Sequence, residues 1–164
     1  MKDPLKCLLT LPEAVAWRDG LRRAGRTLVV TNGCFDLMHR GHASYLIEAA
    51  KLGDELLVLI NSDASVRALK GPSRPLVSAP DRAYLLCALE AVSRAVVFDG
   101  MRCDRELAAL RPDVYAKAGD YTLETMAAPE RQALEAAGSR IVFMPFVSGF
   151  STTGIVEKIL ASRG

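Results

Sequence analysis

The sequence predicts an α/β fold in which a single doubly wound sheet of five parallel strands carries helices on both faces. Five short apolar runs alternate along the chain with segments of helical periodicity, the order typical of such sheets. The run at residues 56–60 is apolar throughout, which indicates a central parallel strand covered on both sides. The length of 164 residues suits one domain, with right-handed crossovers between its strands.

The first half of the chain is expected to begin with a helix over residues 12–24 that ends near Gly25 and packs outside the sheet. A strand over residues 27–31 should follow, and then an amphipathic helix. The apolar stripe of that helix would consist of Ala43, Leu46, Ile47 and Ala50. We therefore expect residues 1–26 to form a helical extension packed on a domain that covers residues 27–164.

After the central strand, Ser62 or Asp63 is expected to cap a short helix through Leu69. Residues 70–75 read as an exposed basic loop, and the next helix should begin at residues 80–82. Strands are predicted over residues 95–98, 114–118 and 141–144, with helices over residues 104–110 and 129–137 between them. Ser151 should cap a last helix whose apolar side is formed by Ile155, Val156, Ile159 and Leu160.

Composition excludes several classes of protein. Lys and Arg number 21 against 19 Asp and Glu, which leaves a net charge of +2 without a block of like charge. Nucleic acid and membrane surfaces are therefore not implied as partners, and no apolar run approaches the ~18 residues of a membrane span. The four cysteines, Cys7, Cys34, Cys87 and Cys103, are widely spaced, contain no C-x-x-C pair and favour a reduced cytoplasmic setting.

The only two histidines of the sequence, His39 and His42, fall three residues apart where the first strand of the domain gives way to a helix. Gly41 between them would let the backbone approach a ligand closely. Backbone N–H groups and the positive end of the helix point into the crevice at such a junction, where α/β sheets bind anions. The same positive end disfavours a proton on imidazole, whereas a bound phosphate favours one. We interpret the junction as a phosphate-handling site.

Two other anion-binding clusters, Lys70 with Arg82 and the helix start at residues 151–153, fall on connections that could share one edge of the sheet. Together the three clusters suit nucleotidyl transfer, in which a phosphate attacks the α-phosphorus of a nucleoside triphosphate and expels pyrophosphate. A phosphate group has a second pKa near ~6, so it needs no general base at neutral pH. The protein has to align the reactants and neutralise the charge that develops on the phosphoryl oxygens.

The His39-Arg40-Gly41-His42 turn, the preceding residues 33–36 and the late Ser151-Thr152-Thr153 helix start resemble the HxGH nucleotidyltransferase superfamily, cytidylyltransferase branch. Within it, residues 31–36, 61–66, 69–75 and 119–121 resemble the adenylyltransferase domain of ADP-heptose synthesis. The resemblance runs from about residue 28 to about residue 160 and implies a Rossmann-like sheet.

The resemblance also implies roles for individual residues. The catalytic residues would be His39, His42 and Lys70. The nucleotide would be bound by Gly33, Cys34, Phe35, Asp36, Gly41, Arg82, Asp120, Ser151, Thr152 and Thr153. The substrate would be bound by Asn61, Asp63 and Lys117. Asp36 either orients the turn or lies close to the metal, and the sequence leaves both roles open. Mg²⁺ is the expected cofactor, held mainly by the triphosphate, with no metal ligand identified in the chain.

By the same resemblance, the expected reaction transfers the adenylyl group of ATP (or the cytidylyl group of CTP) to a sugar 1-phosphate. The sugar phosphate would be heptose 1-phosphate, and the products would be ADP-heptose and pyrophosphate. A glycerol-3-phosphate or related cytidylyltransferase is the alternative on the same fold, and a catalytically silent nucleotide-binding regulatory domain is the alternative of another class. A homodimer is expected, as is a separate sugar kinase, because 164 residues leave no room for a kinase domain.

Simpler interpretations compete with each assignment. The two histidines could ligate zinc, but Asp36 is the only third ligand close in sequence. They could also be structural. Ser151 could be an ordinary helix cap, and Lys70 and Arg82 taken alone read as solvated charges. Cys34 reads as a small buried residue with no sign of a reactive thiolate.

Overall fold

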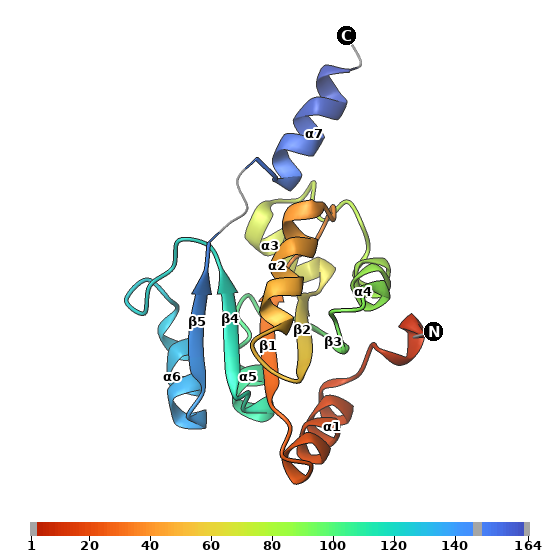
Figure 1. Cartoon of the computed structure of the whole chain (residues 1–164). Coiled ribbons are helices and arrows are strands. Elements are labelled where there is room, and N and C mark those ends of the chain that lie inside the picture. Colours follow the sequence, from red (N-terminus) through yellow and green to blue (C-terminus); the bar gives the residue numbers. More distant parts are fainter. Residues whose placement is uncertain (1–2, 146–148, 163–164) are drawn as a thin grey trace.

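The computed structural model describes residues 3–145 and 149–162 and contains a five-stranded sheet whose strands all run parallel (Figure 1). The strands are β1 (Leu28–Gly33), β2 (Glu55–Asn61), β3 (Arg94–Phe98), β4 (Val114–Ala118) and β5 (Arg140–Met144). Their order is β3-β2-β1-β4-β5, so the chain winds outward from β1 in one direction and returns to continue in the other. The predicted doubly wound α/β fold is confirmed. Ligands of such sheets bind at the carboxyl ends of the strands, at the point where the winding reverses.

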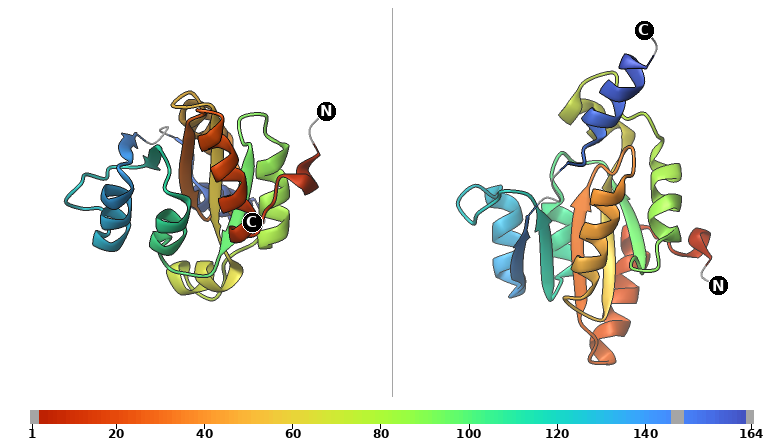
Figure 2. Two further views of the ribbon diagram at one scale, coloured as in Figure 1. Left: turned by 90° about the horizontal axis from the view of Figure 1, so that it is seen from below. Right: turned by 45° about the horizontal axis from the view of Figure 1, so that its top comes forward.

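Helices cover both faces of the sheet (Figure 2). One face is covered by α2 (Arg40–Ala50) and α4 (Ala79–Ala88), and the other by α1 (Leu11–Arg23), α5 (Asp104–Leu110) and α6 (Ala128–Ala137). The side chains of each strand alternate between the two layers, so that Val29 contacts the first and Val30 the second. The short α3 (Asp63–Lys70) directly follows β2, and a 3-10 turn, η1 (Pro4–Lys6), precedes α1.

The last helix, α7 (Thr152–Ala161), lies beyond the carboxyl ends of the strands and outside both helical layers (Figure 1). Ser151 caps it as predicted, because its hydroxyl accepts a hydrogen bond from the Gly154 N–H at 2.9 Å. None of the described side chains of α7 is buried, and Ile159 and Leu160 are exposed. The helix therefore adds little to the core, but its first turn faces the edge of the sheet where the site forms.

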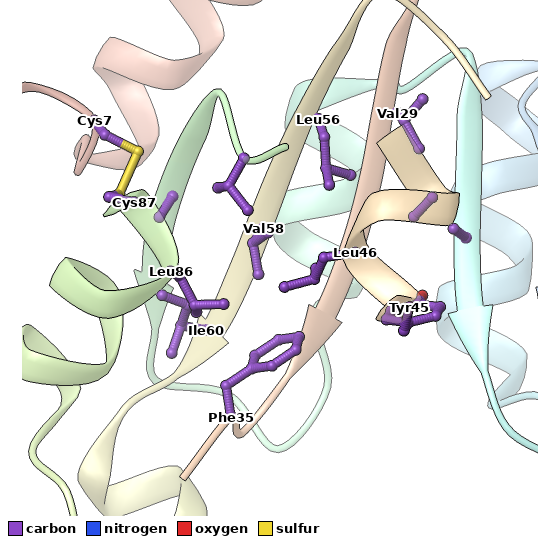
Figure 3. Close-up of a cluster of buried hydrophobic side chains, with 14 of the residues drawn as sticks. Cys7, Val29, Phe35, Tyr45, Leu46, Leu56, Val58, Ile60, Leu86 and Cys87 are labelled. Atoms are coloured by element: carbon purple, nitrogen blue, oxygen red, sulfur yellow. A yellow bond between two sulfur atoms is a disulfide. The ribbon is translucent and has the colours of Figure 1, made fainter. Parts of the chain in front are cut away.

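The apolar stripe predicted for α2 is confirmed at Leu46 and Ala50, which belong to or pack against the core, but not at Ile47. The buried residues are Tyr45, Leu46 and Ala49, whereas Ile47 is half exposed. The helix is rotated so that the Tyr45 ring packs in the core layer while its hydroxyl shares a 2.7 Å hydrogen bond with Thr31 (Figure 3). A tyrosine whose hydroxyl is hydrogen-bonded is as suitable for burial as an aliphatic residue. A prediction that counts only apolar residues misses such a position.

Capping explains why α1 begins at Leu11. Thr10 and Glu13 form a reciprocal capping box, with the Glu13 carboxylate 2.8 Å from the Thr10 N–H. The buried face of α1 includes Arg18, whose guanidinium lies 2.8 Å from the Asp113 carboxylate at the start of β4. Before the helix, Leu8 makes a parallel bridge with Ala95, so the N-terminal segment also extends the edge of the sheet at β3.

Cys7 and Cys87 form a disulfide that joins the N-terminal segment to α4 (Figure 3). The expectation that the widely spaced cysteines are reduced is therefore wrong for this pair, which is separated by 80 positions in sequence. Cys34 and Cys103 are free. Among the described residues, no helix has the length and apolar character needed to cross a bilayer.

Candidate functional site

A cavity of about 440 Å³ opens at the carboxyl ends of β1 and β4, where the winding of the sheet reverses. That volume is in the range of small-molecule sites. The wall is formed by Asn32, Gly33, Cys34, Phe35, Asp36, His39, Gly41, His42, Tyr45, Lys70, Arg74, Lys117, Ala118, Tyr121, Pro145, Phe150, Ser151, Thr152 and Thr153. The His turn, the Lys70 loop and the start of α7 therefore meet at one cavity, as the sequence predicts.

The two histidines form a stacked pair at the start of α2. Their ring centroids are 3.9 Å apart and the ring planes are inclined by 16°. Burial, the adjacent His39 and the charge of Lys70 lower the pKa of His42 to about 4, and burial lowers the pKa of His39. Both rings are therefore neutral near pH 7. The Nδ1 atoms of both are buried without a hydrogen-bond partner among the described residues. Unsatisfied buried polar atoms are rare in folded proteins and frequently mark functional sites.

The turn between β1 and α2 depends on ring packing. Phe35 adopts a left-handed backbone conformation with φ of 49°, which is rare for a bulky residue and is found at functional sites. Its ring fills the space that a Cβ at Gly33 would need, since that atom would lie 2.8 Å from the Phe35 ring. The same ring meets the edge of His42 at a centroid distance of 5.3 Å. The absence of a side chain at Gly33 therefore leaves room for the Phe35 ring next to His42.

Asp36 orients the loop that carries the basic residues. One carboxylate oxygen accepts hydrogen bonds from the Leu76 and Val77 N–H groups at 2.8 and 3.0 Å. The other lies 3.0 Å from an Arg74 nitrogen, at an angle that leaves both atoms without a well-formed hydrogen bond. Asp36 is almost fully buried. Of the two roles that the sequence leaves open, the contacts support orientation, and they bring the Arg74 guanidinium to the cavity wall.

Arg82 does not line the cavity, which corrects the expectation that its charge faces the nucleotide. The residue is completely buried and donates hydrogen bonds to the carbonyl oxygens of Val77 and Cys34 and, at 2.7 Å, to the Asp63 carboxylate. The same Asp63 oxygen accepts a hydrogen bond from the Ala79 N–H. Arg82 thus ties the β1–α2 turn to α3 and α4, and it supports the site from behind.

Asn61 and Asp63, expected to bind substrate, also lie outside the cavity wall. The Asn61 amide donates to the Ser65 hydroxyl at 2.9 Å, and its oxygen lies 3.8 Å from the Cys34 sulfur. Burial is the main reason why the pKa of Cys34 is raised, so its thiol is protonated at neutral pH. Asp120, expected near the nucleoside, is exposed and does not line the cavity.

Lys117, the third residue expected to bind substrate, does reach the cavity, and a buried network holds it there. Its Nζ lies 3.1 Å from the carboxylate of Glu130 on α6 and 3.4 Å from the Tyr115 hydroxyl. Tyr115 in turn donates to the Asn32 side chain at 2.6 Å. The ammonium also lies 4.9 Å from the centre of the Tyr121 ring. Lys117 is therefore a fixed cation at the β4 side of the cavity.

The start of α7 closes the cavity opposite the sheet. Ser151, Thr152 and Thr153 line it with their side chains or backbone, and the Thr152 hydroxyl donates to the Leu37 carbonyl at 3.3 Å. The free N–H groups of the first turn carry a partial positive charge that suits an anionic ligand. The helix start is thus fastened directly to the turn that bears the histidines.

Most of the residues predicted from sequence come together, with Arg82, Asn61, Asp63 and Asp120 as the exceptions. The structure adds cavity-lining residues to which the sequence gave no role, namely Asn32, Tyr45, Arg74, Ala118, Tyr121, Pro145 and Phe150. Asn32, Arg74 and Tyr121 lie inside motifs that carried the resemblance, and their position there was the available signal. In the described part of the chain, no group of three His, Cys, Asp or Glu side chains is arranged to hold a metal ion.

Comparison with known proteins identifies the family of this chain. A family model described as cytidylyltransferase-like matches residues 30–158. The "Bifunctional protein HldE" of Syntrophotalea carbinolica is 50% identical over 139 residues, which cover 85% of this chain and 28% of that protein. The protein of the same name from Methylococcus capsulatus is 47% identical over 158 residues, which cover 96% of this chain and 33% of that protein. The chain thus spans about a third or less of these relatives.

A solved structure has a similar fold. The crystal structure of the lipopolysaccharide core biosynthesis protein from Thermoplasma volcanium superposes with a TM-score of 0.60 at 26% sequence identity. The match covers 75% of this chain and 98% of that one. With a family match that extends over most of its length, and with the stacked histidines at the β1–α2 turn, this chain belongs to the cytidylyltransferase-like family.

Proposed function

We propose that this protein transfers a nucleotidyl group from a nucleoside triphosphate to a sugar 1-phosphate and releases pyrophosphate. The preferred reaction is adenylylation of heptose 1-phosphate by ATP to give ADP-heptose. One observation carries the proposal. Two neutral histidines, Lys70 and the start of α7 converge on one cavity at the switch point of the sheet. That set of groups suits the binding of phosphates and the stabilisation of charge.

In the proposed reaction, an oxygen of the sugar phosphate forms a bond to the α-phosphorus of the triphosphate. The bond from that phosphorus to the bridging oxygen breaks, and its electrons leave with pyrophosphate. The attacking oxygen is already ionised, because the second pKa of a phosphate monoester is near ~6. The chain therefore has to align the two phosphates and stabilise the negative charge on the α-phosphoryl oxygens in the transition state.

His39 and His42 suit the stabilising role. A neutral imidazole donates one N–H without bringing a fixed charge, and the stacking fixes the plane in which each ring can donate. Lys70 and Arg74 supply positive charge on one wall. The α7 start, with Ser151, Thr152 and Thr153, offers N–H groups and hydroxyls to the β- and γ-phosphates. Gly33, Cys34, Phe35 and Gly41 are proposed to border the nucleotide through their backbone.

Mg²⁺ remains part of the proposal as an ion that enters with the triphosphate. Mg²⁺ usually keeps several waters and binds through substrate phosphates, so it does not need a cage of protein ligands. Among the described residues, the cavity wall offers only the Asp36 carboxylate, and this group is committed to Arg74 and two backbone amides. When bound, the ion would neutralise charge on the phosphates.

The sugar phosphate is proposed to occupy the β4 side of the cavity, near Lys117. This ammonium is held by Glu130 and Tyr115 and could pair with the phosphate of the acceptor. Asn32 and the exposed ring of Tyr121 border the same region and could meet sugar hydroxyls and a sugar face. Asn61 and Asp63 lie outside the cavity wall and are not part of the proposed substrate site.

Two further proposals concern the surroundings of the protein. The first is that the protein acts as a homodimer in the cytoplasm. The second is that a sugar kinase activity supplies the sugar 1-phosphate. Neither bears on the chemistry of the cavity.

The test is a substrate panel. Purified protein is incubated with Mg²⁺, with ATP or CTP, and with heptose 1-phosphate, other sugar 1-phosphates or glycerol 3-phosphate, and pyrophosphate is measured. We expect release that depends on ATP and on heptose 1-phosphate. Turnover only with CTP and glycerol 3-phosphate would show that the proposed substrates are wrong and that the protein is a glycerol-3-phosphate cytidylyltransferase. If the protein binds nucleotide but turns over no substrate pair, it is a catalytically silent nucleotide-binding regulatory domain.

A further inference from the structure

The Phe150 ring extends the stack of rings at the catalytic turn. His39 lies between two aromatic neighbours: its ring stacks on His42 at 3.9 Å, and Phe150 lies nearly parallel to it at a centroid distance of 6.3 Å and an inclination of 22°. Beyond His42, the Phe35 ring meets the imidazole edge-on at 5.3 Å. The Arg40 guanidinium also lies over the Phe150 ring, at 5.8 Å. Four rings thus form one continuous column from the core to the surface.

Gly41 shows how tightly this column is packed. A Cβ at Gly41 would lie 3.0 Å from two atoms of the His39 ring and 3.0 Å from the Cβ of Phe150. Few real Cβ atoms have neighbours that close. The missing side chain at Gly41 therefore makes room for His39 and Phe150 to approach each other, a role different from the close approach to ligand that the sequence suggests.

Phe150 is poorly explained as a core residue. It remains 40% exposed, and none of the described residues of α7 is buried. Its contacts with His39, Arg40 and Gly41 all fall on the catalytic turn. It immediately precedes Ser151, which caps α7, and Thr152, whose hydroxyl binds the Leu37 carbonyl before the turn. Phe150 thus joins the half of the site that carries the histidines to the half that carries the helix start.

We propose that Phe150 is a positioning residue for the transfer reaction: its ring holds His39 against His42 and keeps the α7 start in register with the histidine pair. This inference rests on the proposed function, because it assigns a role in that reaction. Aromatic pairs attract each other beyond the area they bury, and the attraction depends on the orientation of the rings. This dependence favours one ring orientation over others. A displacement of about 1 Å in a catalytic group can cost up to about a hundredfold in rate.

The test compares Phe150→Ala with Phe150→Tyr and Phe150→Leu. The alanine variant should lower kcat by about tenfold to a hundredfold, with a smaller change in KM for the triphosphate. Tyrosine retains the ring and should restore most of kcat. Leucine retains apolar volume without a ring and should resemble alanine. Leu160→Ala, an exposed apolar residue further along α7, is the control and should match the parent protein.

A second readout does not depend on turnover. The sequence contains only two histidines, so the His39 imidazole can be assigned by NMR with the aid of a His42→Gln variant. Removal of the Phe150 ring exposes His39, and its pKa should rise towards the ordinary value because burial is what lowers it. The same resonance should also show a more mobile ring.

The outcomes separate the two proposals. If the parent protein turns over and Phe150→Ala retains the parent kcat, or if Tyr and Leu behave alike, the positioning role is overturned. An unchanged His39 titration in Phe150→Ala would also overturn it. If the parent protein turns over no substrate pair, the proposed function fails, and the NMR titration alone then decides whether Phe150 holds His39.

Discussion

The imidazole rings of His39 and His42 stack face to face, with their centroids 3.9 Å apart and their planes inclined by only 16°. Two protonated rings at that separation would repel each other, so the stacked arrangement favours the neutral form of both imidazoles. Burial is the first cause of the lowered pKa of each ring, and for His42 the nearby His39 and Lys70 add to it. This arrangement has consequences for stability and for catalysis.

The first prediction concerns stability against pH. His42 stays neutral in the folded protein down to about pH 4, whereas in the unfolded chain its pKa returns to about 6.5. Between these values the unfolded state binds more protons, so the free energy of unfolding should fall as the pH drops from about 6.5 to about 4. In His42→Gln this part of the pH dependence should disappear. Denaturant titrations of both proteins across that range measure it, and two parallel curves would refute the assignment.

The second prediction separates catalytic from structural histidines. His39→Ala and His42→Ala should each lower kcat by about a hundredfold or more, the usual effect of losing one preorganised donor. The melting temperature should change little, because the donors act mainly in the transition state. Glu48→Gln, on the exposed side of α2, is the control. Full activity combined with a lowered melting temperature in both variants would return the motif to a structural role.

The third prediction contrasts two basic residues that the sequence treats alike. Lys70 is exposed at the cavity, so Lys70→Ala should reduce turnover and leave the free energy of unfolding unchanged. Arg82 is buried between two carbonyl oxygens and Asp63. Arg82→Met should reduce the free energy of unfolding by about 2–4 kcal/mol, because the acceptors lose their donor. Chemical denaturation and initial rates on the same preparations provide the comparison. A stable, inactive Arg82→Met protein would show that Arg82 acts on the phosphates after all.

The fourth prediction concerns the disulfide. Thiol titration of the unfolded chain should find two free cysteines before reduction and four after it. Cys7→Ser should lower the free energy of unfolding by about 2–4 kcal/mol, since it removes a crosslink between residues 80 positions apart. Cys87→Ser should have the same effect, and the double variant should add nothing further. Four free thiols without reduction would contradict the crosslink.

The sequence predicted the fold well because the apolar runs of a parallel sheet and the periodicity of its covering helices are local signals. It was right for α2 at Leu46 but missed the buried tyrosine with a bonded hydroxyl, and it placed the half-exposed Ile47 in the core. The helix caps at Ser62 and Ser151 were also predictable, since capping depends on residues three positions apart.

Burial of charged residues was not predictable, since it depends on packing between distant segments. From the sequence, Arg82 is expected to be a surface charge. In the structure it is hydrogen-bonded to the carbonyl of Cys34, which is 48 positions away in sequence. Glu130 looks like an ordinary helix residue, yet it lies beneath Lys117 with only 4% of its surface exposed. No local pattern distinguishes these side chains from solvated ones.

The central claim is that the bond broken lies between the α- and β-phosphates and that the nucleotidyl group moves to the sugar phosphate. The direct measurement follows radiolabel from ATP, supplied in separate reactions on the α- or the γ-phosphate, with heptose 1-phosphate and Mg²⁺. We predict that the α-label enters the sugar nucleotide and that the γ-label appears in pyrophosphate, with both transfers lost in His39→Ala. Label from the γ-phosphate in inorganic phosphate or on the sugar, with the α-label retained in ADP, would contradict the account.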